Sequence, residues 1–257
     1  GGTALLNSVV KNSHAFISDS KAIESNLKKH IKEKNWDLCK SNILTMGVNS
    51  NKFKNQDEDL SDRLSNLNDK IIISFIGRFV EKKGVENLIK IFYRILKKYP
   101  GCHLLICGQG PLVSYYKYLI NNYKIGDSVS ILNFFNDDKK LTSVYKFTDI
   151  IIVPSIQTEK GETEGVPVSL LESLHNGKLV VASVQSNAKD VIENDKNGLL
   201  FDYLKKNDFE NVFKKAIELQ VEPKLKKIKE EALLKGSIFN WDKISEDYFK
   251  ILYRNNS

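Results

Sequence analysis

Two carboxylates, Glu164 and Glu172, bracket a stretch that runs from Gly165 through Pro167 into an apolar, helix-like segment. A proline near its start is typical of a helix. The free backbone N–H groups of a first helical turn attract anions. Carboxylates beside them repel phosphate, but they accept hydrogen bonds from sugar hydroxyls. A ligand that carries both a phosphate and sugar hydroxyls, such as a nucleotide sugar, fits this combination.

A second candidate group is cationic. Arg78 follows the apolar run Ile71–Ile76 directly, and Lys83 precedes the next amphipathic segment, with Gly77 and Gly84 beside them. Cations at the start of a helix oppose its dipole. An anion as highly charged as a diphosphate explains the arrangement, and a solvated basic turn is the alternative.

The glycine loop Gly108-Gln109-Gly110-Pro111 follows another apolar run, Cys102–Cys107. Its glycines permit close approach of a ligand to the backbone. The spacing matches neither the dinucleotide-binding nor the Walker pattern, so a plain tight turn is the alternative.

Each of the two carboxylates has a candidate role. Glu172 lies among leucines, and we expect it either to hold both hydroxyls of a ribose, as an acid does in dinucleotide folds, or to be an exposed surface group. Glu164 is better placed for a transferred sugar. The four histidines form no recognisable catalytic triad, and none is assigned to catalysis.

Short apolar runs alternate with amphipathic segments from residue 70 onward, which predicts an α/β fold with a Rossmann-like, doubly wound parallel sheet. Ligands of such sheets bind beyond the carboxyl ends of the strands, where the loops named above converge. The expected strands are Ile71–Ile76, Cys102–Cys107, Val129–Leu132, Ile150–Val153, Leu179–Ser183 and Leu199–Phe201. The expected helices are Val85–Tyr99, one ending near Tyr123, Lys139–Phe147, Pro167–Asn176, Ala188–Ile192 and three more at the end of the chain.

The first 48 residues have a different pattern: a strand His14–Ser18, a helix Lys21–Glu33 and a strand Asn42–Met46 are expected. Such a fragment is too small to bury a core of its own. We expect it to pack on the main domain or to be the tail of another domain. Residues 49–70 are polar and aperiodic, which predicts a loop or linker. The predicted domain then spans 71–240, and a terminal helix spans 241–257.

The composition narrows the class of protein. The chain has 257 residues, of which 41% are hydrophobic, and a net charge of +7. Its apolar runs are too short to span a bilayer, and three cysteines without zinc-like spacing favour a reducing cytoplasm. The basic clusters lack interleaved aromatics, so nucleic acid is not an expected partner. Contact with the inner face of a membrane stays a hypothesis.

Taken together, these motifs resemble the C-terminal, donor-binding half of group-1 (family-4) glycosyltransferases of the GT-B architecture. Met46-Gly47-Val48-Asn49 with Phe53 resembles the family's hinge, and the insertion Gln157–Thr163 resembles enzymes that build colanic acid or amylovoran. The other matching segments are Phe75–Phe79, Glu81–Val85, Leu105–Pro111, Asp149–Ser155, Glu164–Glu172 and Asn197–Leu200.

The resemblance implies retaining transfer of a sugar from a nucleotide sugar, with no essential metal or other cofactor and no assigned covalent nucleophile. It implies that Arg78 and Lys83 neutralise the diphosphate, that Glu164 contacts the donor sugar and that Glu172 holds the ribose. The remaining donor-binding residues that it implies are Gly77, Gly108, Asn133, Phe134, Gly165, Val166, Pro167 and Val168.

The chain also departs from the family pattern. Ser186-Asn187 stands where the family has a glycine pair, Lys189 and Asp190 replace a common proline and glutamate, and Asn133 replaces a frequent glycine. These changes concern loop conformation and contacts with the base.

The implied partners are a nucleotide sugar, a glycan or lipid-linked acceptor and an N-terminal acceptor domain. We therefore expect the chain alone to bind nucleoside diphosphates weakly and to turn over little. Two alternatives stay open: a nucleotide-sugar-binding module without catalysis, and another GT-B enzyme such as a sugar-nucleotide epimerase.

Overall fold

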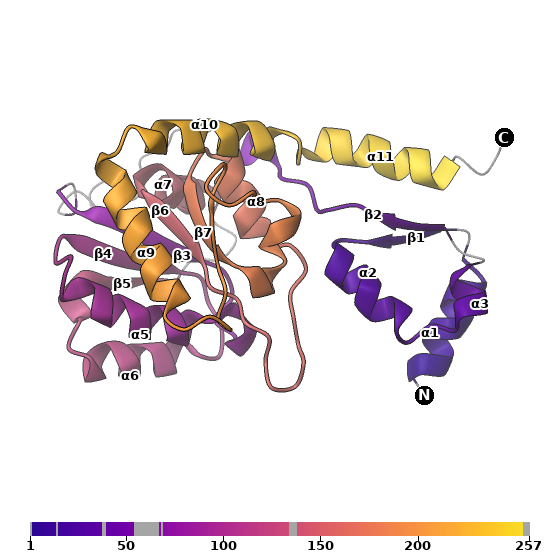
Figure 1. Cartoon of the computed structure of the whole chain (residues 1–257), viewed down its shortest axis with the longest axis horizontal. Coiled ribbons are helices and arrows are strands. Elements are labelled where there is room, and N and C mark those ends of the chain that lie inside the picture. Colours follow the sequence, from indigo (N-terminus) through magenta and orange to yellow (C-terminus); the bar gives the residue numbers. More distant parts are fainter. Residues whose placement is uncertain are drawn as a thin grey trace.

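The computed structural model describes residues 2–13, 15–37, 40–53, 67, 69–133 and 138–253. The described chain forms a large α/β part and a small part (Figure 1). The small part consists of the described residues between 2 and 43. All predicted site residues that the structure describes lie in the large part.

Six parallel strands form the sheet of the large part, in the order β5-β4-β3-β6-β7-β8. The chain builds outward from β3 to one edge and then returns to β6 beside it, so the strand order reverses between these two strands. The predicted doubly wound parallel sheet is confirmed, and each strand has its predicted bounds. These are β3 (Ile71–Ile76), β4 (Cys102–Cys107), β5 (Val129–Leu132), β6 (Ile150–Val153), β7 (Leu179–Ser183) and β8 (Leu199–Phe201).

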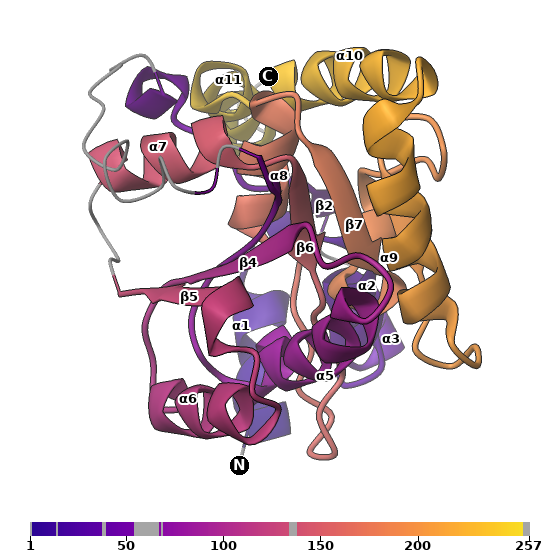
Figure 2. The same ribbon diagram turned by 90° about the vertical axis from the view of Figure 1, so that its left-hand side faces the viewer.

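Helices cover both faces of this sheet because alternate strand residues point to opposite sides. Ile150 and Ile152 pack into one cluster with α5, α6 and α9, whereas Ile151 and Val153 pack into another with α8 and α10. Figure 2 shows α5 and α6 on one side of the strands and α7 on the other. The bounds are α5 (Val85–Leu96), α6 (Val113–Asn122), α7 (Asp138–Phe147), α8 (Val168–His175), α9 (Asp208–Glu218), α10 (Lys224–Ser237) and α11 (Trp241–Tyr253).

Short 3-10 turns complete the connections of the large part. Ala188–Ile192, predicted as a short helix, contains one of them. They are η1 (Ser50–Phe53), η3 (Glu81–Lys83), η4 (Gly126–Ser128), η5 (Val184–Ser186), η6 (Ala188–Asp190) and η7 (Leu219–Val221).

The small part holds a two-stranded parallel sheet and differs from the prediction in three ways. Its first helix was not predicted. The predicted helix Lys21–Glu33 ends at Lys28, and a separate short helix begins at Glu33. The second strand begins and ends earlier than 42–46. The elements are α1 (Gly2–Lys11), β1 (Ala15–Ser18), α2 (Lys21–Lys28), α3 (Glu33–Trp36) and β2 (Lys40–Ile43).

These corrections have local causes. The chain turns after Lys28 because Ile31 packs against Val10 in a small apolar cluster, and this turn ends the helix. The four residues of β1 pair with β2 up to the Ser18–Ile43 pair, so the strand ends there. His14, predicted to begin β1, lies outside the described residues.

Two segments run side by side between the parts. The Val48 N–H donates to the Phe239 carbonyl at 2.6 Å, and the Trp241 N–H donates to the Val48 carbonyl at 3.3 Å. Gly47 lies so close to Trp241 that a Cβ atom there would overlap its ring. From this junction α11 extends away from the large sheet toward the small part (Figure 1).

Candidate functional site

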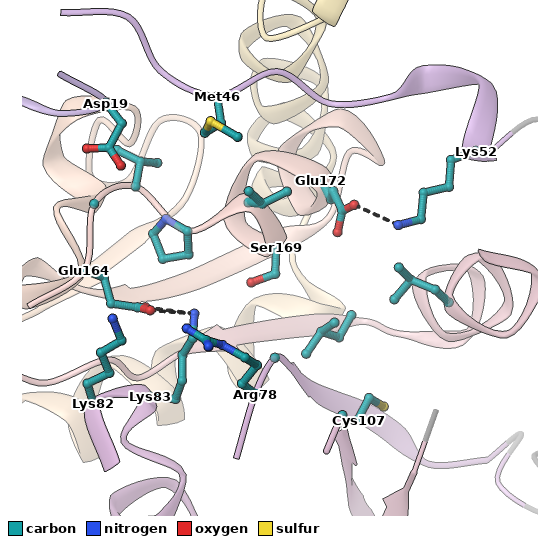
Figure 3. Close-up of a pocket in the computed structure, with 18 of the residues that line it drawn as sticks. Asp19, Met46, Lys52, Arg78, Lys82, Lys83, Cys107, Glu164, Ser169 and Glu172 are labelled. Atoms are coloured by element: carbon teal, nitrogen blue, oxygen red, sulfur yellow. Dashed lines mark hydrogen bonds and ion pairs between the residues drawn. The ribbon is translucent and has the colours of Figure 1, made fainter. Parts of the chain in front are cut away.

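A cavity of about 610 Å³ lies at the carboxyl end of β3, where the strand order reverses. This is the position at which doubly wound sheets bind ligands. Figure 3 shows its side chains converging from the large sheet, the small part and the segment that joins them. The predicted site residues that line it are Gly77, Arg78, Lys83, Gly108, Glu164, Gly165, Val166, Pro167, Val168 and Glu172.

The cationic end of the cavity is the turn between β3 and α5. Gly84 ends this turn with a left-handed φ of 68°, and a Cβ atom there would overlap the Pro154 carbonyl. The turn therefore packs directly on the loop that follows β6. Arg78 is exposed, and no ion pair or hydrogen bond of its side chain is found among the described residues. Its guanidinium is available to an anion.

Glu164 is nearly buried, with 8% of its surface exposed. Lys83 Nζ lies 2.8 Å from its Oε1, and the Ser155 hydroxyl donates to Oε2 at 2.7 Å. The Asn187 side-chain amide donates to the Glu164 backbone carbonyl. These contacts fix the carboxylate at the mouth of the α8 N-terminus, beside the cationic turn.

Asn187 also explains the departure from the expected glycine pair. Its φ is 56°, a left-handed conformation that asparagine tolerates better than most residues. The loop thus keeps a glycine-like backbone conformation while the side chain holds Glu164 in place.

Glu172 lies in the second turn of α8 and is 8% exposed, which excludes the surface alternative. The Tyr145 hydroxyl shares its proton between Glu172 Oε2 at 3.1 Å and the Ser169 carbonyl at 3.2 Å, and Lys52 Nζ lies 3.2 Å from Glu172 Oε1. Burial raises the pKa of Tyr145 well above its usual value, so this hydroxyl keeps its proton and acts as a donor. The second predicted acid is thus held in a defined orientation at the other end of the cavity.

The N-terminus of α8 lies between the two acids. Pro167 is its N-cap, so the amides of Val168 and Ser169 have no helical carbonyl one turn earlier. Such amides carry a partial positive charge that favours an anion. This end, Arg78 and Lys83 make one half of the cavity suited to a phosphate group.

The glycine loop has a packing role that its sequence left open. Gly108, with φ at 144°, lies against the Gly77 carbonyl, and Gly110, with φ at 156°, lies against the Phe79 backbone. Both close approaches leave no room for a side chain. The loop therefore fits the β3 turn tightly, and Gly108 still reaches the cavity.

The structure does not bring every predicted residue to the cavity. Asn133 is exposed just beyond β5 and is not part of the lining. Phe134 lies outside the described residues.

Lining residues of the cavity that were not predicted from the sequence include Lys52, its partner Asp138 and Asp19. Lys52 belongs to the stretch predicted as a linker, yet it contacts Glu172. Asp19 comes from the small part, and its carboxylate lies where a Cβ atom on Gly165 would be. Its Oδ1 is buried and has no hydrogen-bond partner among the described residues. The resemblance of Phe53 to a hinge was the one sequence signal close to Lys52.

The described part of the chain shows neither a metal-binding cluster nor a membrane-spanning helix. It contains no group of three or more histidine, cysteine or acidic side chains that could hold a metal ion. None of its helices is long and apolar enough to cross a bilayer.

The model of the family described as "Glycosyl transferases group 1" matches residues 56–234. The chain belongs to this family. The predicted membership is confirmed, and the match covers the large sheet, Arg78, Lys83 and both acids of the cavity.

Curated relatives in the family include enzymes named for polysaccharide synthesis. The amylovoran biosynthesis glycosyltransferase AmsK of Erwinia amylovora is 31% identical over 162 residues, which is 63% of this chain and 38% of AmsK. The putative colanic acid biosynthesis glycosyltransferase WcaL of Escherichia coli K12 is 28% identical over 125 residues, 49% of this chain and 30% of WcaL. The chain thus spans about a third of the length of these relatives.

Solved structures of glycosyltransferases share the fold. The Anabaena protein HepE in complex with UDP superposes with a TM-score of 0.80 at 17% identity, over 98% of this chain and 68% of HepE. Sucrose-phosphate synthase of Thermosynechococcus elongatus gives a TM-score of 0.77 at 21% identity, over 99% and 61% of the two chains.

Proposed function

We propose that this chain is the donor-binding part of a retaining glycosyltransferase that uses a nucleoside diphosphate sugar. The observation that carries this proposal is a pair of buried acids, Glu164 and Glu172, at the two ends of one cavity. The half of the cavity beside Glu164 is cationic. A nucleotide sugar has hydroxyls at both ends and a diphosphate between them. The order of hydroxyls, diphosphate and hydroxyls in the ligand matches the order of acid, cationic region and acid in the cavity.

In the proposed complex, Arg78, Lys83 and the first amides of α8 bind the diphosphate. Glu172 accepts hydrogen bonds from the ribose, and Glu164 accepts them from the donor sugar. Asn133, which is exposed just beyond β5, stays the described candidate neighbour of the base. The complex of HepE with UDP supports this choice of ligand by analogy of fold.

The proposed reaction breaks the bond between the sugar's anomeric carbon and the diphosphate oxygen. Both electrons of that bond stay on the oxygen of the leaving nucleoside diphosphate. An acceptor hydroxyl forms the new bond on the same face, and its proton passes to the leaving phosphate. Arg78 and Lys83 offset the charge that develops on the leaving group, a role that metal ions fill elsewhere. Glu164 stabilises the positive charge at the anomeric centre.

The acceptor is proposed from the named relatives. AmsK and WcaL are named for exopolysaccharide synthesis, so a glycan or lipid-linked sugar is the favoured class of acceptor. The reaction is proposed to take place in the cytoplasm, at the inner face of a membrane. Flotation of the chain with anionic vesicles, against neutral vesicles as the control, tests the membrane contact.

Calorimetric titration tests the donor site. We expect UDP or GDP to bind, Glu172→Ala to weaken that binding about tenfold or more, and EDTA to leave it unchanged. A hydrogen bond to a charged group typically contributes about 1.5–3 kcal/mol, which is the basis of this magnitude. Absence of nucleotide binding, or full affinity in Glu172→Ala, contradicts the proposal.

The same samples separate the alternatives. Interconversion of UDP-sugars without an acceptor indicates a sugar-nucleotide epimerase. Binding without transfer, also in a longer form of the protein that includes an acceptor domain, indicates a binding module.

A further inference from the structure

Lys52 is the one cation found at the Glu172 end of the cavity among its described lining residues. Its ammonium lies 3.2 Å from Glu172 Oε1 and 3.0 Å from Asp138 Oδ1. The Lys52 side chain is 19% exposed, and the Glu172 side chain is 11% exposed. The pair is therefore mostly removed from water, where an ion pair is held more firmly than at the surface.

The backbone at Lys52 is also fixed. The Thr142 hydroxyl of α7 donates to the Lys52 carbonyl at 3.1 Å. Phe53 packs edge-on against the Tyr145 ring, with 5.5 Å between ring centres. Tyr145 in turn donates to Glu172. Lys52 of η1 and Tyr145 of α7 therefore contact the same carboxylate, and the two elements pack against each other. Figure 3 shows the contact of Lys52.

This arrangement leaves a specific part of Glu172 free. An ionised carboxylate has about four acceptor positions, two on each oxygen. Lys52 uses one position on Oε1, and Tyr145 uses one on Oε2. One position remains on each oxygen, and the plane of the carboxylate is fixed by its two partners. One free acceptor position on each oxygen matches in number the two neighbouring hydroxyls of a ribose.

The charge of Lys52 is maintained in this setting. Burial opposes the charge, but the carboxylates of Glu172 and Asp138 outweigh it and raise the pKa of Lys52 above its usual value. The ammonium therefore stays protonated at neutral pH and keeps its donors. Removing it leaves a nearly buried carboxylate without its counter-charge, and the orientation of Glu172 is then set by Tyr145 alone.

We propose that Lys52 is a positioning residue for nucleoside recognition, which orients Glu172 so that its two free acceptor positions receive the 2′ and 3′ hydroxyls of the ribose. The inference rests on the proposed function and extends it to the segment that joins the two parts of the molecule. Lys52 itself contacts Glu172 and Asp138, and it acts on the ligand through Glu172.

The test compares UDP with 2′-deoxy-UDP, or GDP with 2′-deoxy-GDP if the protein binds guanosine nucleotides. The measured quantity is the ratio of the two dissociation constants on one protein. Because both ligands meet the same sample, a variant that is partly unfolded gives an unchanged ratio. We compare the wild type with Lys52→Met, Lys52→Arg and Glu172→Gln. Lys90→Met is the matched control, because Lys90 also pairs with a glutamate but lies outside the cavity.

We expect the wild type and Lys90→Met to prefer the ribonucleotide about tenfold. Lys52→Met and Glu172→Gln should bring the ratio close to one, and Lys52→Arg should restore most of the preference. Displacement by inorganic pyrophosphate should be equal in the wild type and Lys52→Met, since the phosphate half is untouched.

A full ribose preference in Lys52→Met, together with its loss in Glu172→Gln, overturns the inference and leaves the proposed function standing. Equal binding of both nucleotides by the wild type overturns the ribose role and the inference with it. If the wild type binds no nucleotide, the proposed function itself fails.

Discussion

Lys83 and Glu164 form an ion pair across the crevice of the sheet, with 2.8 Å between Nζ and Oε1. Lys83 lies in the turn after β3, and Glu164 lies in the loop after β6. The strand order reverses between β3 and β6. The cation proposed to bind phosphate is thus already neutralised by the acid proposed to bind the sugar. A nucleotide sugar has to insert between them or share them.

Glu164→Gln should therefore separate binding from transfer. The substitution removes a negative charge beside the phosphate site and keeps the hydrogen bond from Ser155, so UDP affinity should stay equal or rise up to about tenfold. The proposed sugar transfer should fall at least about a hundredfold, because the charge at the anomeric centre loses its partner. Calorimetry and a transfer assay measure the two effects. Loss of UDP binding in Glu164→Gln contradicts this prediction.

Arg78→Ala should weaken diphosphate binding without changing stability. Its guanidinium is exposed and has no partner among the described residues, so its removal breaks no internal contact. We expect about a tenfold or greater loss in UDP affinity and an unchanged melting temperature. Arg94→Ala is the control, because Arg94 pairs with Glu210 outside the cavity. Equal loss in both variants would point to a general effect of surface charge.

Gly165→Ala should disturb the contact between the two parts of the molecule. A Cβ atom there would overlap the Asp19 carboxylate, so either the α8 loop or the small part has to move. We expect nucleotide affinity to fall, and the double variant Gly165→Ala with Asp19→Ala to recover most of it. A double-mutant cycle on the dissociation constants measures this coupling. Additive effects would show that the two residues act independently.

The stability of the fold should depend on His103 in acid. Burial, with a smaller effect of Lys70, lowers the pKa of His103 from 6.5 to about 4. The folded pKa lies below the unfolded one, so the unfolded chain takes up the proton first. The resulting stability is complete above about pH 6.5 and is lost as the pH falls through about 4.

Urea unfolding of the wild type and His103→Gln checks this dependence. Between pH 6.5 and 4 the wild type should lose up to about 1.4 kcal/mol more per pH unit than the variant. The two curves should run parallel above pH 7. Parallel curves over the whole range would mean that His103 does not titrate differently in the folded state.

The large sheet was predicted in detail because each of its strands is a short apolar run with breaks at both ends. Ile150–Val153, for example, is followed by Pro154, and all four of its residues are buried. The loops after such strands must meet at one edge, which is why Arg78, Lys83 and Glu164 could be placed together from their order alone. The sequence was thus sufficient to predict those site residues that directly follow a strand of the sheet.

Lys52 and Asp19 could not be found in this way. Lys52 and Glu172 are 120 residues apart, and the contact depends on how η1 packs on α7. Asp19 reaches Gly165 through the placement of a separate small part. In that part, the turn of the chain at Ile31 depends on a contact with Val10 of α1, a helix that was not predicted. Tertiary contacts between short elements set these features.

The paired segments at Val48 and Phe239 determine how the two parts can move. Because two neighbouring segments, joined by the hydrogen bonds of Val48, connect the parts, we expect any relative motion of the parts to be a rotation about this connection. Asp19 of the small part lies against Gly165 of the large part, so such a rotation would change this contact. Lys52 follows Val48 closely in the chain and is bound to Glu172 and to Thr142 of the large part, so we expect the Glu172 end of the cavity to change least.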